Sequence, residues 1–122
     1  MTAASVTVGA NGTFAMNAST VTVSSVVTMS SATAAITGGA YTLILSRDDG
    51  GNAFSWSAGL FQTQTQTLAE VRVTGTSNLN IPTTGTSGDV YFPKLSIAFT
   101  GKTTSINNAG AAGLGVFAAV LY

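Results

Sequence analysis

Short runs of alternating apolar and hydroxyl residues, broken by glycine or serine, constrain the fold of this chain more than any other feature. The segments 5–8, 20–23 and 41–46 all follow this pattern. No stretch places apolar residues at the i, i+3, i+4 and i+7 spacing of an amphipathic helix. The many threonine and valine residues favour a pleated, half-buried surface. We therefore predict an all-β chain of about eight short strands, with little or no helix.

Two turn motifs predict hairpins. Asn11–Gly12 tolerates positive φ, which is typical of a tight connection from the first strand to residues 13–17. The segment 47–51, with sequence RDDGG, separates two alternating strands at 41–46 and 52–57, which we expect to pair with each other. Antiparallel hairpins repeated along the chain indicate two packed sheets. The predicted fold is therefore an antiparallel two-sheet sandwich of the jelly-roll or Greek-key type.

The two prolines refine this picture. Residues 76–89 include Pro82, two glycines and many short hydroxyl side chains, so we expect a loop there. Pro93 has no N–H to donate to a ladder, which indicates an edge strand or a bulge. No internal repeat or domain boundary is visible in the chain, and its length suits one domain spanning 1–122.

The charge content narrows the classes of partner. Only 7% of the residues are charged and the net charge is zero, whereas ordinary domains carry about 25% charged residues. A hydrophobic content of 45% argues against disorder. The few lysines and arginines form no cluster, which argues against nucleic-acid binding. Because neutral surfaces promote association, we expect much of the surface to be covered in a homo-oligomer or by partner proteins.

The residue types present do not assemble a catalytic or metal site. The chain has no histidine and no cysteine, so the commonest general base and the commonest metal ligands are missing. We predict no enzyme activity, no cofactor and no metal. Asp48 and Asp49 are interpreted as turn residues, with a weak cation site as the alternative. Glu70 and Arg72 are expected to form a surface ion pair, or a pair that sets register at an oligomer interface.

One polar segment is a candidate interface. Residues 62–67 alternate strictly between glutamine and threonine, and neither face of such a strand is apolar enough for a core. Two interpretations stay open: an extended arm lying on a neighbouring subunit, or a solvated edge strand. The candidate interface residues here are Gln62, Thr63, Gln64, Thr65, Gln66 and Thr67.

The apolar segment 109–122 raises a second possibility of assembly. It is shorter than the ~20 residues that a membrane-spanning helix needs, and glycine weakens a helix further, so no membrane contact is expected. A strand over 116–122 would be apolar on both faces. Such a strand is either central in the fold or covered by a partner. Phe117, Leu121 and Tyr122 are its candidate interface residues.

Most aromatic residues are expected in the core, because each buries a large area. Trp56 stands between two serines and is the one candidate for an exposed ligand-binding aromatic.

The composition as a whole resembles that of small neutral β proteins of tailed-phage virions. The chain is rich in threonine, alanine, glycine and serine, lacks cysteine and histidine, and shows no secretory signal at its start. The resemblance implies a capsid decoration (cement) protein in the virion, assembled in the host cytoplasm, that binds the major capsid protein or other virion proteins. Two alternatives stay open: a subunit of a surface filament or adhesin that assembles by strand pairing outside the cell, or a small carbohydrate-binding β module using Trp56.

Overall fold

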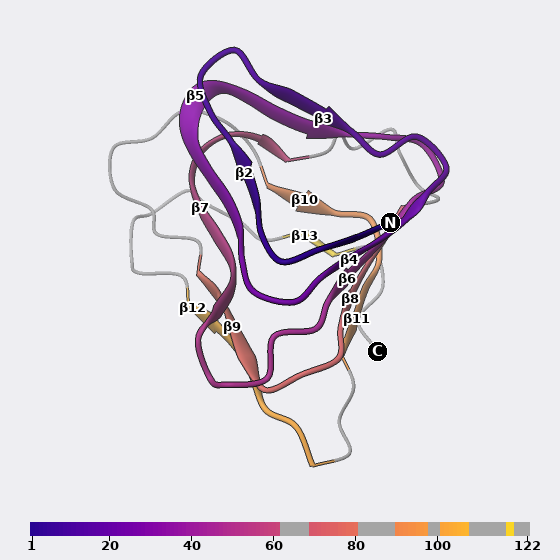
Figure 1. The fold of residues 1–122 in the computed structure, drawn as a ribbon, viewed down its shortest axis with the longest axis vertical. Coiled ribbons are helices and arrows are strands. Elements are labelled where there is room, and N and C mark those ends of the chain that lie inside the picture. Colours follow the sequence, from indigo (N-terminus) through magenta and orange to yellow (C-terminus); the bar gives the residue numbers. More distant parts are fainter. Residues whose placement is uncertain (62–68, 81–89, 98–100, 108–116, 119–122) are drawn as a thin grey trace.

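The chain is built of β-strands that wind around a common axis (Figure 1). The computed structural model describes residues 1–61, 69–80, 90–97, 101–107 and 117–118, and these contain no helix. The strands, in chain order, are β1 (Thr2–Ala3), β2 (Val6–Val8), β3 (Thr13–Ala15), β4 (Thr20–Val23), β5 (Val27–Thr37), β6 (Thr42–Leu45), β7 (Asn52–Phe61), β8 (Glu70–Val73), β9 (Ser77–Asn80), β10 (Tyr91–Phe92), β11 (Leu95–Ile97), β12 (Thr104–Asn107) and β13 (Phe117–Ala118).

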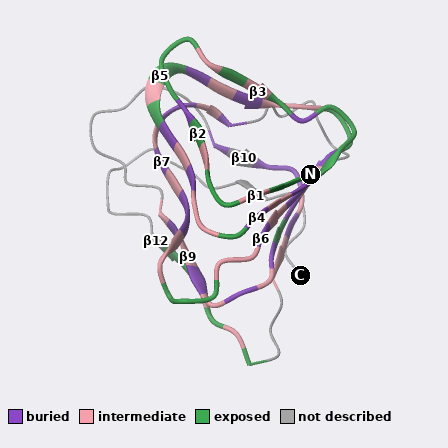
Figure 2. Cartoon of the chain, in the orientation of Figure 1, coloured by how far each residue is buried: buried purple, intermediate pink, exposed green. Residues whose placement is uncertain are grey.

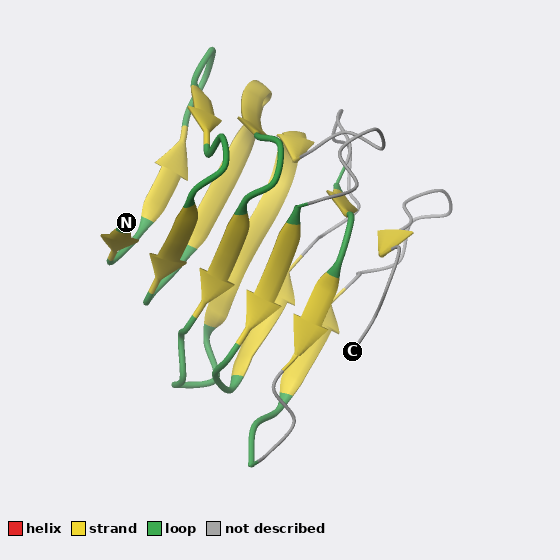
Figure 3. Cartoon of the chain, turned by 90° about the vertical axis from the view of Figure 1, so that its right-hand side faces the viewer, coloured by secondary structure: helices red, strands yellow, loops and turns green. Residues whose placement is uncertain are grey.

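Every described strand pair is parallel, and the strands form three faces. Face A has the strand order β1-β4-β6-β8-β11, and face B has the order β12-β9-β7-β5-β2. Face C is the third side, where β3 pairs with the end of β5 and β10 pairs with β13. The chain visits face A, then face B, then face C, and returns to face A one position further along the axis. Figure 3 shows the resulting rows of strands.

The expected antiparallel two-sheet sandwich, and with it the jelly-roll or Greek-key topology, is therefore wrong. The fold is a parallel β-solenoid, in which each coil pairs with the coil before it and the coil after it. The strand content was predicted correctly, but the direction of pairing was not. Strands that lie far apart in sequence pair here, and strands that are adjacent in sequence do not.

The predicted turns exist but bend the chain at a corner of the solenoid and do not reverse it. The amide of Gly12 donates to the carbonyl of Gly9 over 3.0 Å, and Asn11 has φ 58°. The flanking strands β2 and β3 nevertheless both pair with β5 and not with each other. In the same way, the 47–51 turn separates β6 in face A from β7 in face B. Both predicted hairpins are wrong for this reason.

Neither proline-based prediction is confirmed. Within the expected loop 76–89, residues 77–80 form the regular strand β9, in which Ser77 and Leu79 are buried. Residues 81–89 lie outside the described residues. Pro93 lies in the corner between β10 and β11 and in neither strand, so the prediction that it marks an edge strand or a bulge is not confirmed.

The core consists of columns of apolar side chains that stack from coil to coil. On face A one column contains Val21, Leu43, Val71 and Leu95, and each residue lies beside the next in the parallel register. All four are at most 2% exposed. Figure 2 shows how buried and more exposed residues alternate along the strands. The predicted alternation of the 41–46 segment is confirmed, with Tyr41, Leu43 and Leu45 inside.

Aromatic residues fill the interior between faces B and C. The ring centroids of Phe54 and Phe61 are 5.0 Å apart, and those of Phe54 and Phe92 are 5.8 Å apart, both at steep interplanar angles. Edge-to-face contacts of this kind add to the stabilisation from apolar burial. These three rings join strands that belong to successive coils.

The corner between faces B and C depends on a glycine. Gly59 in β7 has φ +103°, and a Cβ atom there would lie 2.7 Å from the carbonyl oxygens of both Ala34 and Ser31. The indole Nε1 of Trp56 donates to the carbonyl of Gly59 over 3.0 Å inside the core. A side chain at Gly59 would therefore clash with these carbonyl oxygens, and the positive φ disfavours any residue other than glycine.

We predict that Gly59→Ala lowers the free energy of unfolding by about 2–4 kcal/mol, from backbone strain and overpacking together. Urea unfolding followed by Trp56 fluorescence measures the change. Gly39→Ala is the matched control, because a Cβ atom at Gly39 meets nothing within 4 Å and its φ is not positive. Equal stabilities for the two variants would contradict this account of the corner.

Candidate assembly surface

The sequence-predicted interface residues fall mostly outside the described part of the chain. Residues 62–67, together with Leu121 and Tyr122, are among those not described. Phe117 belongs to β13, where its backbone pairs with Tyr91 of β10. The possibility that 62–67 lies on a neighbouring subunit therefore stays a prediction.

Trp56 lies in the core. Its side chain is 0% exposed and its only polar atom is bonded to Gly59. It therefore offers no surface to a carbohydrate. The alternative of a carbohydrate-binding module that uses an exposed Trp56 is not supported.

The acidic pair Asp48 and Asp49 lies in a turn, as interpreted from the sequence. The Asp49 carboxylate accepts from Arg47 Nε over 2.6 Å and from the Gly51 amide over 2.9 Å. Asp48 accepts from the Thr76 amide over 2.7 Å and pairs with Lys102. These carboxylates link the corners of three coils. No group of three or more acidic, histidine or cysteine side chains that could hold a metal occurs among the described residues.

Glu70 and Arg72 form the expected ion pair on the outer surface of face A. Arg72 Nη2 lies 3.1 Å from Glu70 Oε2, and the Ser96 hydroxyl donates to Glu70 Oε1 over 2.7 Å. Lys94 Nζ lies 3.7 Å from the same carboxylate. The Glu70 carboxylate on β8 is thus paired with Arg72 on its own strand and with Lys94 and Ser96 at β11. These contacts link β8 to β11, so we assign the carboxylate a structural role.

One open surface of the described structure is the edge of the first coil, which consists of β1, β2 and β3. In the described strand order, β1 pairs only with β4, and β2 and β3 pair only with β5. Among the described residues, nothing pairs with the other side of these three strands. Each of the three faces therefore ends here in a strand with one neighbour.

The hydrogen bonds show which residues point their backbone groups away from the neighbouring coil. Val6 donates to Val26, and Met16 donates to Thr37, so these residues use their amides toward the second coil. In a parallel ladder alternate residues turn their N–H and C=O groups to opposite sides. Thr7 on β2 and Thr13 and Ala15 on β3 therefore turn theirs outward, and all three are exposed.

This edge carries no charged side chain and no proline, although its strands are only two or three residues long. Natural edge strands are guarded by charged side chains, proline or bulges. Residues 1–46 include no Asp, Glu, Lys, Arg or Pro. The edge is consequently a neutral template on which a further strand can pair.

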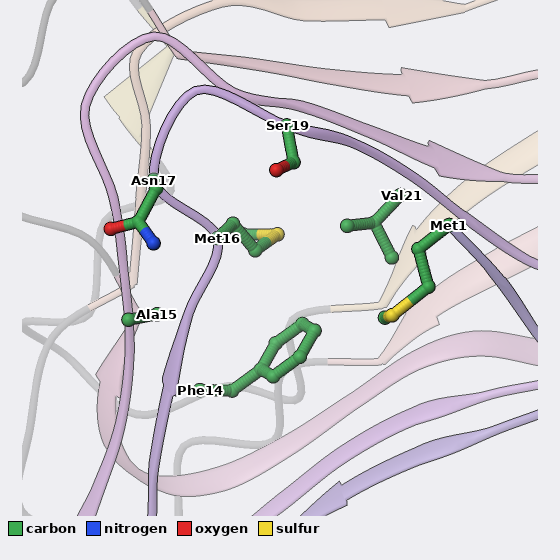
Figure 4. Close-up of a pocket in the computed structure, with 7 residues that line it drawn as sticks. All are labelled: Met1, Phe14, Ala15, Met16, Asn17, Ser19 and Val21. Carbon is green, nitrogen blue, oxygen red and sulfur yellow. The ribbon is translucent and has the colours of Figure 1, made fainter.

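An apolar groove opens beside this edge, at the corner where face C leads into face A (Figure 4). The groove is shallow, and the empty space in and above it, including space open to solvent, is about 310 Å³. Figure 4 shows the side chains of Met1, Phe14, Met16 and Val21 around one open space. The residues that line the groove are Met1, Phe14, Ala15, Met16, Asn17, Ser19 and Val21.

The groove lies at the first coil, where the columns of stacked apolar side chains end. Phe14 stacks on Ile36 of the second coil and is only partly buried, whereas Ile36 is 1% exposed. Met1 is 65% exposed at the rim. An apolar side chain from another molecule would continue the columns and bury this surface.

Sequence reasoning did not identify the first coil as an interface. The sequence predicted a hairpin between residues 5–8 and 13–17. In a hairpin these two strands would pair with each other inside the domain. The signal that could have identified the surface was the distribution of charge. All eight charged residues lie after position 46, and the overall charge content concealed this asymmetry.

Comparison with protein families, curated proteins and solved structures found no match to the chain. Within the described residues, no helix is long and apolar enough to span a membrane. The assignment of a function therefore depends on the geometry alone.

The turn at 47–51 makes stability dependent on pH. Arg47, and after it the Gly51 amide, lower the pKa of the exposed Asp49 carboxyl to about 2. The unfolded value is about 3.9. The stabilisation from the ionised carboxylate is therefore present above pH ~4 and is lost as the pH falls through about 2. Lys102, and after it the Thr76 amide, also lower the pKa of Asp48.

We predict that the urea midpoint falls as the pH is lowered from 4 to 2, and that Asp49→Asn flattens this dependence. The measurement is a series of unfolding curves across that window. An unchanged slope in the variant would show that Asp49 does not carry the pH dependence.

Proposed function

We propose that this chain is a non-enzymatic structural protein that binds another protein chain along the open edge of its first coil. The observation that supports this most is the open parallel edge on all three faces, which has no charged side chain and no proline and lies next to an apolar groove. Addition of a strand to a sheet edge gains affinity from main-chain hydrogen bonds, and pockets for side chains add specificity. The first coil offers both.

The arrangement of the charged residues supports a structural role. Arg47 with Asp49, Asp48 with Lys102, and Glu70 with Arg72 form ion pairs at corners and along face A. A general acid or base needs a carboxyl group whose pKa is raised towards neutrality. The three described aspartate and glutamate carboxyl groups that carry shifts all have lowered pKa values.

Capsid decoration is the specific role that we propose within this class, on the basis of the composition. Such a role requires a small rigid body that binds the major capsid protein or other virion proteins, and it would place the protein in the virion. A filament or adhesin subunit is the second candidate, because strand pairing through an open edge also serves end-to-end assembly. The filament role additionally requires that the opposite end of the solenoid accept a strand.

We predict that Thr7→Pro abolishes binding to the partner chain while leaving the fold intact. Proline is tolerated in an edge strand where the missing N–H faces away from the ladder, and Thr7 occupies such a position. The measurement compares wild-type and variant protein, each carrying a photo-crosslinking residue at Ala15, after irradiation in an extract of the native source. The readout is the set of cross-linked chains identified by mass spectrometry.

Ile106→Pro is the matched control, because Ile106 lies on β12 at the opposite edge of face B and also turns its amide away from β9. The proposal requires a cross-linked structural protein or second copy that disappears in Thr7→Pro and persists in Ile106→Pro. Retention of every cross-link in Thr7→Pro, with an unchanged thermal midpoint, would overturn it.

A further inference from the structure

We propose that Asn11 is a site of spontaneous deamidation, at which the backbone nitrogen of Gly12 closes a ring on the Asn11 side chain and water then opens the ring to an acid. This inference goes beyond the proposed function and does not depend on it. The product is aspartate or isoaspartate, and both carry a negative charge. Because residues 1–46 have no charged side chain, the corner between β2 and β3 acquires its first one as the protein ages.

The reaction needs no partner other than water. The Gly12 nitrogen loses its proton to solvent and attacks Cγ of Asn11, so that a C–N bond forms in a cyclic imide and the side-chain nitrogen leaves as ammonia. Water then adds to a carbonyl carbon of the ring and breaks its bond to nitrogen. Glycine favours the first step because it has no side chain to hinder the close approach of its nitrogen. The sequence contains one Asn–Gly pair, Asn11–Gly12.

The surroundings of Asn11 leave its side chain available to react. Asn11 is exposed at the corner between β2 and β3 (Figure 2). Among the hydrogen bonds of the described residues, Asn11 contributes only its backbone amide, which donates to Thr33 Oγ1 over 2.8 Å. The Gly12 amide donates to the Gly9 carbonyl over 3.0 Å, so this bond must open before the nitrogen attacks. A bond in an exposed turn opens at a low cost in free energy.

The turn at 47–51 holds a comparable pair that its contacts protect. Asp49 is also followed by a glycine with positive φ at Gly50. The Asp49 carboxylate accepts from Arg47 Nε over 2.6 Å, and the Gly50 amide donates to the Thr76 carbonyl of the next coil over 2.9 Å. Both reacting groups are therefore held by other partners, and an ionised carboxylate is a poor electrophile. The structure thus favours reaction at Asn11.

Asn17 provides a matched comparison within the same chain. Asn11 and Asn17 are both exposed, and both have positive φ, 58° and 50° respectively. The residue after Asn17 is Ala18, whose Cβ atom hinders the attacking nitrogen. The two sites share a backbone conformation and differ in the residue that follows, so a comparison of their rates isolates the effect of the glycine.

The test incubates the folded protein at mildly alkaline pH in water enriched in a heavy oxygen isotope, followed by digestion at acidic pH in ordinary water. Deamidation of the folded protein incorporates the heavy isotope, whereas deamidation during digestion does not. Mass spectrometry of the peptides then gives the rate at each asparagine. We expect labelled aspartate and isoaspartate at Asn11, at a rate at least about tenfold above that at Asn17, which corresponds to about 1.4 kcal/mol in activation free energy.

Two variants locate the reaction. Asn11→Gly tolerates the positive φ and should give no labelled acid at this corner. Ala18→Gly should create a second reactive pair and raise the rate at Asn17. Equal rates at Asn11 and Asn17 in the wild type would overturn the inference, because the glycine would not direct the reaction. An Asn11 that stays intact in the folded protein but reacts in urea would also overturn it, because the turn would then protect the residue.

Discussion

The parallel in-register pairing of successive coils is the constraint on which the rest of the structure depends. Because strands pair in register, each inward side chain lies directly beside the inward side chain of the next coil. Val21, Leu43, Val71 and Leu95 form one such column. The ring contact between Phe54 and Phe61 is of another kind, because both residues lie on β7. Coils can vary in sequence and length as long as these columns remain apolar, which explains why no repeat is visible in the sequence.

The alternation of single strands could be predicted from the sequence, because the period of two is a local property of the backbone. Tyr41, Leu43 and Leu45 lie inside for that reason. The pairing partner of each strand could not be predicted in the same way. Asn11–Gly12 has the same backbone preference at a solenoid corner as in a hairpin, and only contacts with β5 distinguish the two. The strand Ser77–Asn80 was missed because its hydroxyl and amide residues are stabilised by neighbouring coils, not by their own propensity.

The candidate site illustrates the same limit. The sequence identified Trp56 from its flanking serines, but serine faces outward on β7 while Trp56 points into the core. The ion pair between Glu70 and Arg72 could be predicted because both lie on one strand. The contact between Asp48 and Lys102 joins residues far apart in sequence, and it follows only from the stacking of coils.

The edge strands of a solenoid differ from its inner strands in how their backbone groups are satisfied. A coil in the middle has both edges satisfied, so only the terminal coils have backbone groups to offer. Terminal repeats with a polar outer surface are the usual way to stop further stacking. Here the first coil has no charged side chain and no proline, and an apolar groove lies beside it. Assembly through the first coil stays a proposal, supported by the outward backbone groups of its strands and by the apolar groove beside them.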